Sequence, residues 1–324
     1  MRSITYYYST AKENDELTRK IGDLSDKKGV VFVDVCIDGD PQLDERFADD
    51  VPVVLVGPYR INSPFTITEV EVAINAILER DAANLEAIDD KKRFSFSNME
   101  KFSLWFSRFY VWVITSIILL FVGFAFLAPV LMAAGRTSSA EALYRFYKLL
   151  CHQLFYRSFF IDGEQAFYPR ELAGIADLKT FEEVTGKPAE DLIFARNYKG
   201  NETLGFKIAL CQRDIPIYLS MALFGIVFEA TNRKIKPIKW YLWFIIALIP
   251  IGLDGFSQLP GLAAGWPAWL PIRESTPLLR VLTGTLFGTG TAWYMYPLME
   301  EGMKETRFQL ERKKKIVQRM SVPK

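Results

Sequence analysis

Almost uncharged stretches of about 20 residues recur along the second half of the chain, and they limit its fold more than any other feature. A helix needs roughly 20 consecutive apolar residues to cross the hydrocarbon core of a bilayer. The hydrophobic content of the whole chain, 50%, is ordinary for a globular protein, so the distribution matters and not the average. The pattern predicts a helical membrane bundle with four spans, at 109–134, 208–230, 240–259 and 277–298.

Lysine and arginine near the ends of the spans predict their orientation, because basic residues favour the cytoplasmic side. Three segments are basic: the approach to the first span, the turn at 233–239 and the tail at 300–324. With four spans, all three fall on one side of the membrane. We therefore expect a multi-pass protein of the cell membrane with both termini in the cytoplasm, and residues 135–207 and 260–276 outside it. Polar residues follow the opening Met-Arg-Ser-Ile-Thr-Tyr, so no cleavable signal peptide is expected.

Residues 143–160 do not fit a span, because Arg145, Lys148 and Arg157 interrupt an otherwise amphipathic pattern. We expect this segment to be an interfacial or re-entrant helix. A polar insert follows at 162–207, and its composition does not indicate a role.

The first 83 residues differ from the rest, with charges throughout and alternating strand-like and helix-like runs. Strands are expected at 3–8, 30–35 and 53–56, and helices at 11–24, 41–47 and 67–78. This alternation predicts an α/β domain, in which helices cover the faces of a small sheet. A charged, helical connector at 84–107 is expected to lead to the membrane domain at 108–299.

The order of these runs resembles the glutaredoxin-like branch of the thioredoxin fold. The resemblance rests on Asp38-Gly39-Asp40-Pro41-Gln42-Leu43 and Val51-Pro52-Val53-Val54, and it implies a cis peptide bond before Pro52. The family's Cys-x-x-Cys after the first strand is missing, because residues 9–14 read Ser-Thr-Ala-Lys-Glu-Asn. Thiol exchange needs a thiolate, so we expect the domain to be redox-silent. We interpret Cys36, which lies inside an apolar run, as a buried structural thiol.

Polar residues of the membrane region gather where the predicted topology places the outer ends of the spans. Charged side chains within spans are costly, and they are usually functional or paired. The set combines the side-chain types of metal, acid–base and anion sites. Its members are Cys151, His152, Gln153, Arg157, Ser158, Cys211, Arg213, Asp214, Tyr218, Asp254, Gln258, Arg273, Glu274, Ser275 and Arg280.

In this set the chain resembles a family of predicted membrane proteins grouped as a domain of unknown function. The resemblance rests on four motifs in order: Cys-His-Gln-x-x-x-Arg-Ser-Phe at 151–159, Cys-Gln-Arg-Asp at 211–214, Asp-Gly-x-x-Gln at 254–258 and Arg-x-x-Thr-Gly at 280–284. Many members have Cys-x-x-Cys in place of Cys211 and Asp214, and a shorter insert. The resemblance implies a membrane architecture and no activity. Gly284 and Gly288 form a Gly-x-x-x-Gly that helix packing explains.

Three interpretations of the cysteines and the histidine stay open. Cys151, His152, Cys211 and Asp214 are candidate ligands of zinc or another divalent metal, since thiolate, imidazole and carboxylate all bind zinc. Adjacent helical positions point about 100° apart, so Cys151 and His152 fit one ion only if the helix ends there. A Cys151–Cys211 disulfide is the second interpretation, on an oxidising outer side. Buried thiols beside a hydrogen-bonded histidine are the third.

The arginines allow two interpretations. Guanidinium groups match phosphate and carboxylate oxygens, so the arginines of the set are candidates to hold an anion such as a lipid head group. Pairing with Asp214, Asp254 and Glu274 accounts for them equally well. The candidate substrate contacts are Gln153, Arg157, Arg213, Tyr218, Gln258, Arg273, Ser275 and Arg280.

Three classes of function follow from these patterns. The first is a membrane-embedded enzyme acting on a lipidic or anionic substrate, with His152, Asp214 and Asp254 as candidate catalytic residues. The second is a transporter or sensor of a small solute or ion, which with four spans requires a homo-oligomer. The third is a scaffold whose N-terminal domain binds a cytoplasmic partner. A net charge of +1 argues against a nucleic-acid partner.

Overall fold

A computed structural model of the chain describes residues 3–12, 14–83, 95–258 and 273–321. The chain divides into two compact units. The N-terminal unit comprises residues 1–105 together with 305–324, and the helical unit comprises residues 106–304. The expected connector residues 84–94 and residues 259–272, at the end of the third predicted span and in the segment expected outside the membrane, lie outside the described residues.

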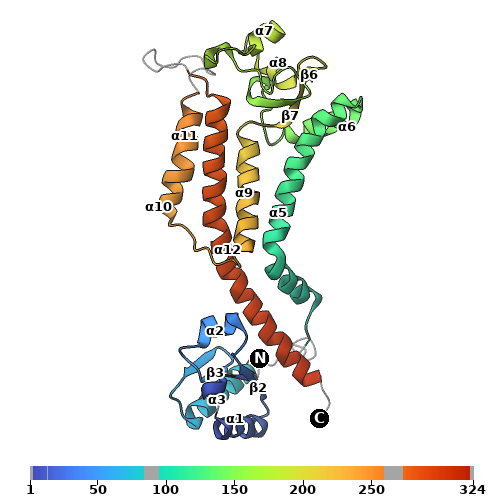
Figure 1. Ribbon diagram of the computed structural model, residues 1–324. Helices are drawn as coiled ribbons and strands as arrows, with labels where there is room; N and C mark the ends of the chain where they lie inside the picture. The colour runs from blue at the N-terminus through green and yellow to red at the C-terminus, as the bar shows by residue number, and fades with distance from the viewer. Residues whose placement is uncertain (1–2, 13, 84–94, 259–272, 322–324) are drawn as a thin grey trace. The chain divides into compact units, whose positions relative to one another are not determined.

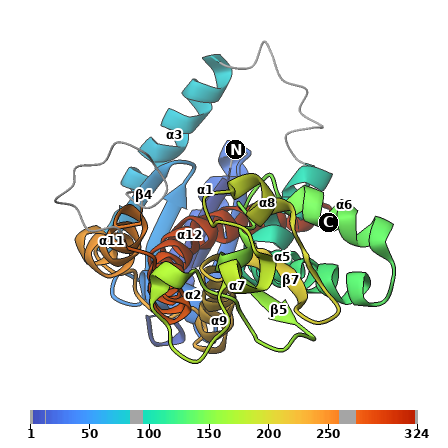
Figure 2. The same cartoon turned by 90° about the horizontal axis from the view of Figure 1, so that it is seen from above.

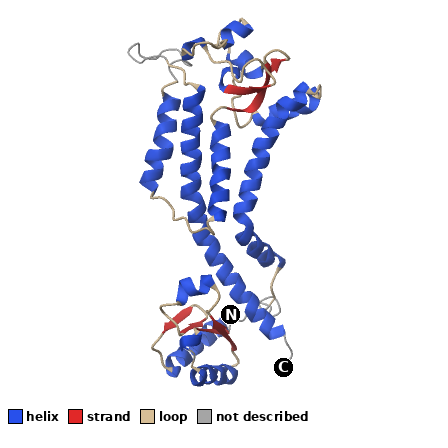
Figure 3. Ribbon diagram, in the orientation of Figure 1, coloured by secondary structure: helices blue, strands red, loops and turns tan. Residues whose placement is uncertain are grey.

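The N-terminal unit contains a four-stranded sheet whose strands alternate with helices (Figures 1 and 3). Its elements are β1 (Ser3–Tyr8), α1 (Asp15–Lys28), β2 (Val31–Cys36), α2 (Pro41–Phe47), β3 (Val53–Val56), β4 (Tyr59–Asn62) and α3 (Ile67–Ala83), with a 3-10 turn at Thr10–Lys12. The order across the sheet is β2-β1-β3-β4. Strands β1 and β2 are parallel and the other pairs antiparallel. The predicted mixed α/β class is confirmed. Strand β4 was not predicted, because its mostly exposed residues show no apolar pattern.

Apolar side chains cover both faces of this sheet. Alternate residues of a strand point to opposite faces, and on β1 Tyr6 joins one cluster while Tyr7 joins the other. Tyr7 stacks on Phe47 of α2, with ring centroids 4.5 Å apart. The peptide bond between Val51 and Pro52 is cis, as the resemblance implies.

Cys36 is exposed, so its interpretation as a buried structural thiol is wrong. It is the last residue of β2, and its Sγ lies 3.8 Å from Oγ1 of Thr10. The backbone N–H of Thr10 donates to Asp38 at 2.8 Å. An apolar run does not show where its strand ends, and the residue at the end of a strand leaves the core.

Residues 305–321 are the last turns of α12 (Pro277–Ser321) and belong to the N-terminal unit. Arg46 pairs with Glu305 at 3.0 Å, and its guanidinium lies 3.9 Å from the centroid of Phe308. Phe308 packs against the cluster that contains Tyr7, and Ile316 is buried. The segment predicted as a basic tail is therefore helical and packed against the sheet.

Four helical segments run side by side in the helical unit, in the order α11, α12, α9 and α5 (Figures 1 and 2). Their bounds are Asn98–Ala133 for α5, Asp214–Ala230 for α9, and Trp240–Trp243 for α10, which continues through a π-helical stretch at Phe244–Leu248 into α11 at Ile249–Phe256. Among the described residues, α5 alone is long and apolar enough to cross a membrane, and Trp240–Phe256 is a shorter apolar helix. The largely helical character of this region is confirmed.

Glycines bring the helices of this unit close together. A Cβ at Gly288 of α12 would lie 2.2 Å from the carbonyl oxygen of Ile217 on α9. At Gly225 of α9 it would lie 2.5 Å from Oγ1 of Thr115 on α5. Real Cβ atoms do not approach so closely, so only glycine fits. Helix packing therefore explains the Gly-x-x-x-Gly of α12, as expected.

The chain between α6 (Thr137–Tyr147) and α9 forms a small sheet with short helices at one end of the helical segments (Figure 1). Buried aromatic rings, among them Phe155, Tyr168 and Phe181, fill its core. The strands run antiparallel in the order β5-β7-β6. Its elements are β5 (Ser158–Ile161), β6 (Gly200–Asn201) and β7 (Gly205–Cys211), with α7 (Phe181–Thr185), α8 (Leu192–Asn197) and 3-10 turns at Phe155–Arg157 and Glu171–Ala173.

Two predictions about this region are wrong. Helix α6 ends at Tyr147, so residues 151–157 lie in a loop and a 3-10 turn and not on a helix at 143–160. The second helical segment begins at Asp214 and not at 208, because residues 205–211 form β7. A short apolar run fits a buried strand as well as the start of a span, and periodicity does not separate the two.

Lys207 attaches three parts of this region to one another. Its side chain is fully buried on β7. The ammonium donates to the backbone carbonyl of Gln153 at 2.6 Å, of Arg196 at 2.8 Å and of Ala195 at 3.4 Å. The loop after α6 and the end of α8 are thereby fixed against β7.

Candidate functional site

A cavity of about 620 Å³ lies in the helical unit where α9 and α12 begin. Three kinds of side chain form its wall: arginines, a group of thiols and a carboxylate, and aliphatic residues. They come from the loop after α6, from α8 and from the starts of α9 and α12. The lining residues are Leu150, Cys151, His152, Gln153, Leu154, Arg157, Leu192, Ile193, Arg196, Cys211, Arg213, Asp214 and Arg280.

Two thiols and a carboxylate meet in this wall. Cys151 follows α6, Cys211 ends β7 and Asp214 begins α9. The two Sγ atoms and a carboxylate oxygen of Asp214 all lie within 4.8 Å of one another. Both cysteines are free thiols. The arrangement brings together three of the four predicted metal ligands.

The neighbours of Cys151 disfavour its thiolate. The hydrogen bond with Cys211 raises the pKa of the Cys151 thiol above its usual value, and burial raises it further. The nearby charges of Cys211 and Asp214 act in the same direction. Cys151 is therefore a weaker acid than an isolated cysteine.

His152 lines the cavity without joining this group. Its side chain is exposed, whereas that of the preceding Cys151 is buried. The two residues lie in a loop, and the next residue, Gln153, has a φ of +52°. Two adjacent residues were expected to fit one ion poorly. The group of Cys151, Cys211 and Asp214 avoids this difficulty, because it does not include His152.

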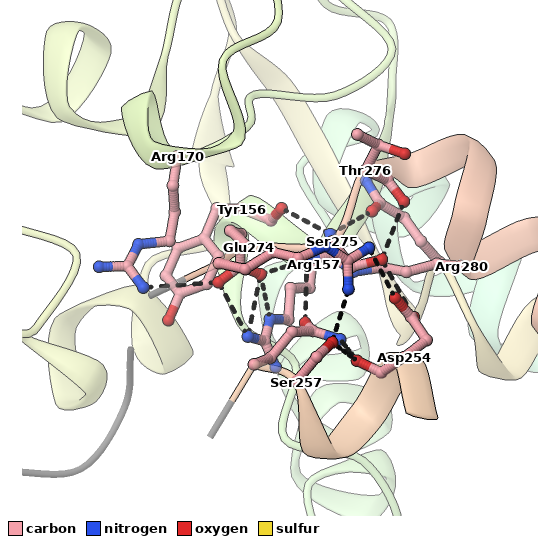
Figure 4. Close-up of polar contacts among 12 residues, drawn as sticks. Tyr156, Arg157, Arg170, Asp254, Ser257, Glu274, Ser275, Thr276 and Arg280 are labelled. Carbon is pink, nitrogen blue, oxygen red and sulfur yellow. Dashed lines mark hydrogen bonds and ion pairs between the residues drawn. The ribbon is translucent and has the colours of Figure 1, made fainter. Parts of the chain in front are cut away.

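Glu274 is a buried carboxylate, 6% exposed, that accepts from three arginines (Figure 4). Arg157 donates to both of its oxygens, from Nε at 2.9 Å and from Nη2 at 3.0 Å. Arg170 donates at 3.4 Å, and Arg280 donates as well. Such two-pronged pairs fix the orientation of the guanidinium plane as well as its position.

Asp254 is the second buried acid, 4% exposed. It accepts from Arg213, from Arg273 at 3.3 Å and from Oγ of Ser275 at 3.0 Å. The predicted pairing of arginines with Asp254 and Glu274 is thus present. Asp254, a candidate catalytic residue by sequence, has its carboxylate occupied by these donors.

Arg280 connects the surroundings of the two acids. Its side chain is 3% exposed. Besides Glu274 it donates to Oε1 of Gln212 at 2.9 Å and to Oε1 of Gln258 at 3.5 Å. Gln258 in turn donates to the backbone carbonyl of Asp254. One arginine therefore contacts both groups of partners.

Positive charge exceeds negative charge around the two buried acids. Five guanidiniums share the two carboxylates, and Arg170 has a further partner in the exposed Glu190 at 2.7 Å. Buried Nε atoms of Arg213, Arg280 and Arg196 have no hydrogen-bond partner among the described residues. The five sharing arginines are Arg157, Arg170, Arg213, Arg273 and Arg280. The guanidiniums of these five residues therefore outnumber the two buried carboxylates that they share.

The remaining predicted contacts have other surroundings. The side chain of Gln153 donates to the carbonyls of Tyr144 and Ala209, each at 3.0 Å. Tyr218 packs edge-on against Phe121, with centroids 5.0 Å apart, and does not line the cavity. Arg273, Gln258 and Ser275 also lie outside the cavity wall, beside Asp254.

Three residues of this region were not predicted as site residues: Arg170, Arg196 and Gln212, the last of which appeared only as part of the motif at 211–214. Arg170 and Arg196 belong to the insert, whose composition had indicated no role. The insert does contain one local sequence signal of structure. Thr180 and Glu183 form a capping box, which marks the start of α7 but indicates neither arginine. No such pattern indicates that Arg196 reaches the cavity, because tertiary contacts place it there.

These features define a class: a helical protein of membrane type with an arginine-rich cavity beside an inserted sheet. Residues 202–294 match a family model described as "Predicted membrane protein (DUF2085)". A protein of Methanocaldococcus jannaschii, "Uncharacterized protein MJ1492", is 30% identical over 203 residues, 60% of this chain and 94% of that protein. The chain belongs to the DUF2085 family of predicted membrane proteins. No solved structure matches the chain.

The family match covers one part of the site. It includes Cys211, Asp214, Asp254 and Arg280, and it begins after Cys151. The membrane family expected from the sequence is confirmed. The individual motifs and the resemblance of residues 1–83 to a thioredoxin-like domain stay predictions.

Proposed function

We propose that the chain is a membrane-embedded enzyme acting on an anionic, lipidic substrate that binds in the cavity of the helical unit. The observation that carries this proposal is the excess of guanidinium groups over buried carboxylates around the cavity. Guanidinium groups suit phosphate and carboxylate oxygens because they offer several donors in a fixed plane.

The anionic part of the substrate would lie among Arg157, Arg196, Arg213 and Arg280. All four line the cavity. Arg157 and Arg213 each donate to a buried acid. Within the described part of the chain, Arg196 donates only to the backbone carbonyl of Lys148. Arg196 therefore has the most charge left for a ligand.

An apolar margin supports a lipidic substrate. Leu150, Leu192 and Ile193 line the same cavity and are 60%, 40% and 76% exposed. Leu149 beside them is 83% exposed. Large apolar side chains exposed together mark binding surfaces. An acyl chain on this margin, with its head group among the arginines, would match both halves of the wall.

Two cavity residues are candidates for proton transfer. The exposed imidazole of His152 can reach solvent and ligand alike, and imidazole is the commonest general acid–base group. Asp214 offers a carboxylate in the thiol group. The held carboxylate of Asp254 suits the positioning of Arg213 and Arg273 better than proton transfer.

We infer that the four helical segments cross the membrane with both termini in the cytoplasm and the cavity at the outer face. Their side-by-side arrangement and their agreement with the four predicted spans support this topology. The basic segments provide the orientation. The membrane lipid is then the nearest source of an amphiphilic anion.

We also infer a thioredoxin-like, redox-silent domain at residues 1–83. The strand order and the cis peptide bond before Pro52 support the resemblance. The 3-10 turn after β1, Thr10–Lys12, contains no cysteine, although the family's Cys-x-x-Cys follows the first strand. Thiol exchange needs a thiolate, so a redox-silent domain is the better proposal.

Binding of a short-chain phosphatidic acid to the full-length protein in detergent tests the proposal. Titration calorimetry with dihexanoyl phosphatidate should show binding, and Arg196→Gln should weaken it about tenfold, or 1.4 kcal/mol. Arg145→Gln is the matched control, because this exposed arginine does not line the cavity. No binding, or equal binding by both variants, would overturn the anionic site. Inorganic phosphate binding as tightly as the phosphatidate would overturn the lipidic part.

Mass spectrometry of the lipid after incubation tests catalysis. A new product that disappears with His152→Ala and Asp214→Ala combined would support the enzyme. Binding without chemical change would overturn it in favour of a transporter or sensor, the alternative that uses the same cavity. The scaffold alternative predicts no ligand in the cavity at all.

A further inference from the structure

We propose that Cys151, Cys211 and Asp214 bind a divalent metal ion of the zinc type in the cavity wall. The role of the ion rests on the proposed function, whereas its presence is tested independently of any substrate.

The ligand atoms are spaced for one ion. Zinc–sulfur bonds of about 2.3 Å in a tetrahedral site place neighbouring ligand atoms about 3.8 Å apart. The two Sγ atoms and the Asp214 oxygen lie within 4.8 Å of one another. Shifts of less than an ångström, within reach of side-chain rotation, would close them on an ion.

The backbone of each ligand is held by regular structure. The N–H of Cys151 donates to the carbonyl of Tyr147 at 2.8 Å, in the last turn of α6. Cys211 pairs with Ser158 across the sheet, and Asp214 is the first residue of α9. Ligands on fixed elements give a more precise site than ligands on loose loops.

A backbone N–H group points at one of the two sulfurs. The N–H of Asp214 donates to Sγ of Cys211 at 3.4 Å. A donor of this kind stabilises charged sulfur and orients it, as the groups behind metal ligands do.

Gln153, two residues after Cys151, adopts a strained backbone. Its φ of +52° is uncommon for a residue other than glycine. Hydrogen bonds of its side-chain amide and of its carbonyl, the latter from Lys207, hold it there. Its Oε1 is buried and has no partner among the described residues, in a side chain that lines the cavity. Such strain concentrates at functional positions.

The chemistry of the ligands selects the class of ion. Two sulfurs and one carboxylate suit zinc and similar borderline-soft ions, whereas magnesium and calcium prefer oxygen alone. Three protein ligands leave a fourth position, and the group borders the cavity. Catalytic zinc sites keep such a position for water or substrate. The ion would also add positive charge to the cavity wall.

Elemental analysis of the full-length protein, purified with zinc and without chelators, tests the inference. We expect about one zinc per chain, and a loss of about tenfold or more in affinity with Cys211→Ala. Cys36→Ala is the matched control, because this third cysteine is exposed in the N-terminal unit. Cobalt substitution should give sulfur-to-cobalt absorption in the near ultraviolet for the wild type and for Cys36→Ala only.

Three results would overturn the inference. The first is a wild type without bound metal after zinc loading. The second is equal metal in Cys211→Ala and Cys36→Ala. The third is the titration of only one thiol in the denatured, unreduced wild type, which would establish a Cys151–Cys211 disulfide. Asp214→Asn, which keeps the shape of the side chain, replaces Cys211→Ala if that variant does not fold. Arg196→Gln should keep the metal, so the anion site and the metal site fail separately.

Discussion

At the scale of single residues, the buried acids decide how the cavity arginines lie. Glu274 accepts from three guanidiniums and Asp254 from two. Removing one partner of a buried ion pair leaves the other charge uncompensated, which costs more than the pair itself contributes. The stability of the site therefore depends on keeping each acid paired.

Glu274→Gln is expected to destabilise the helical unit by about 3–5 kcal/mol, because the guanidiniums of Arg157, Arg170 and Arg280 all lose their common carboxylate. Unfolding of the protein in detergent, followed by circular dichroism, measures the loss. Adding Arg280→Met should recover part of it, since the most deeply buried of the three unpaired charges is then gone. A single variant within about 1 kcal/mol of the wild type, the range of a surface pair, would contradict this account.

The sequence predicted which residues meet in the site better than how they meet. Cys211 and Asp214 were both expected within the span at 208–230, whereas they end a strand and begin a helix. The turn between the two elements still brings their side chains together, so the predicted contact is present although the predicted element was wrong. Exposure was harder to predict. His152 and Cys36 are both exposed, and residue type alone does not indicate where a strand or loop leaves the core.

At the scale of elements, the contact of α9 with α12 depends on a missing side chain. Gly288→Ala should destabilise the protein by about 1–3 kcal/mol, because its Cβ would press on Ile217 and force the helices apart. Thermal unfolding measures the change. Gly302→Ala on the same helix is the control: nothing lies within 4 Å of its Cβ, so helix propensity alone should stabilise the protein by up to about 1 kcal/mol. Equal effects would refute the packing role.

Helix α6 is attached through tyrosine hydroxyls. Tyr147 donates to the carbonyl of Phe121 and Tyr144 to that of Lys207. Burial raises the pKa of Tyr147 to about 12, and it raises that of Tyr144 as well. Between a pH of about 10, where an unfolded tyrosine titrates, and 12, the folded state therefore keeps a proton that the unfolded state loses.

Stability should accordingly fall as the pH rises above 10. Tyrosinate absorbance at 295 nm and unfolding curves between pH 8 and 12 measure it. Tyr147→Phe should be less stable at neutral pH, where it lacks the hydrogen bond, and should lose less stability above pH 10. An alkaline loss identical to that of the wild type would show that Tyr147 does not contribute to it.

Elements were predictable where their apolar pattern was unambiguous. Helix α2 and strand β3 have the expected bounds, because a change of period and nearby turn residues mark them. Residues 208–210 were assigned to a span because Ile-Ala-Leu is equally apolar in a strand. Strand β4 lacks such a pattern, and pairing with β3 forms it.

At the scale of the whole molecule, the proposed topology makes Cys36 a natural reporter. It is exposed, so a membrane-impermeant maleimide should label it only after the membrane is permeabilised. Cys151→Ser and Cys211→Ser remove the other thiols from the experiment. In the same background without Cys36, Lys187→Cys, at an exposed position of the insert, should be labelled in intact cells. Labelling of Cys36 in intact cells would reverse the orientation.

The insert shows the limit of prediction for the molecule as a whole. Its sheet and aromatic core depend on contacts among residues that lie anywhere from 155 to 206. These residues are far apart in the sequence, and their apolar positions follow no common period. Local rules locate the capping box at Thr180, yet they do not bring α8 to the cavity. Contacts of this range are decided by the complete chain.

The sharing of two acids among five arginines has a further consequence for any anion that enters the cavity. Glu274 and Asp254 accept from guanidinium donors before a ligand arrives, so they hold these arginines in the way that a bound anion would. The side chains have then already lost their rotational freedom, and association does not have to order them again. Such preorganisation makes affinity depend on geometry more than on net charge. A carboxylate behind the proposed anion pocket, which looks unfavourable by charge alone, is then the group that holds the arginines in place before binding.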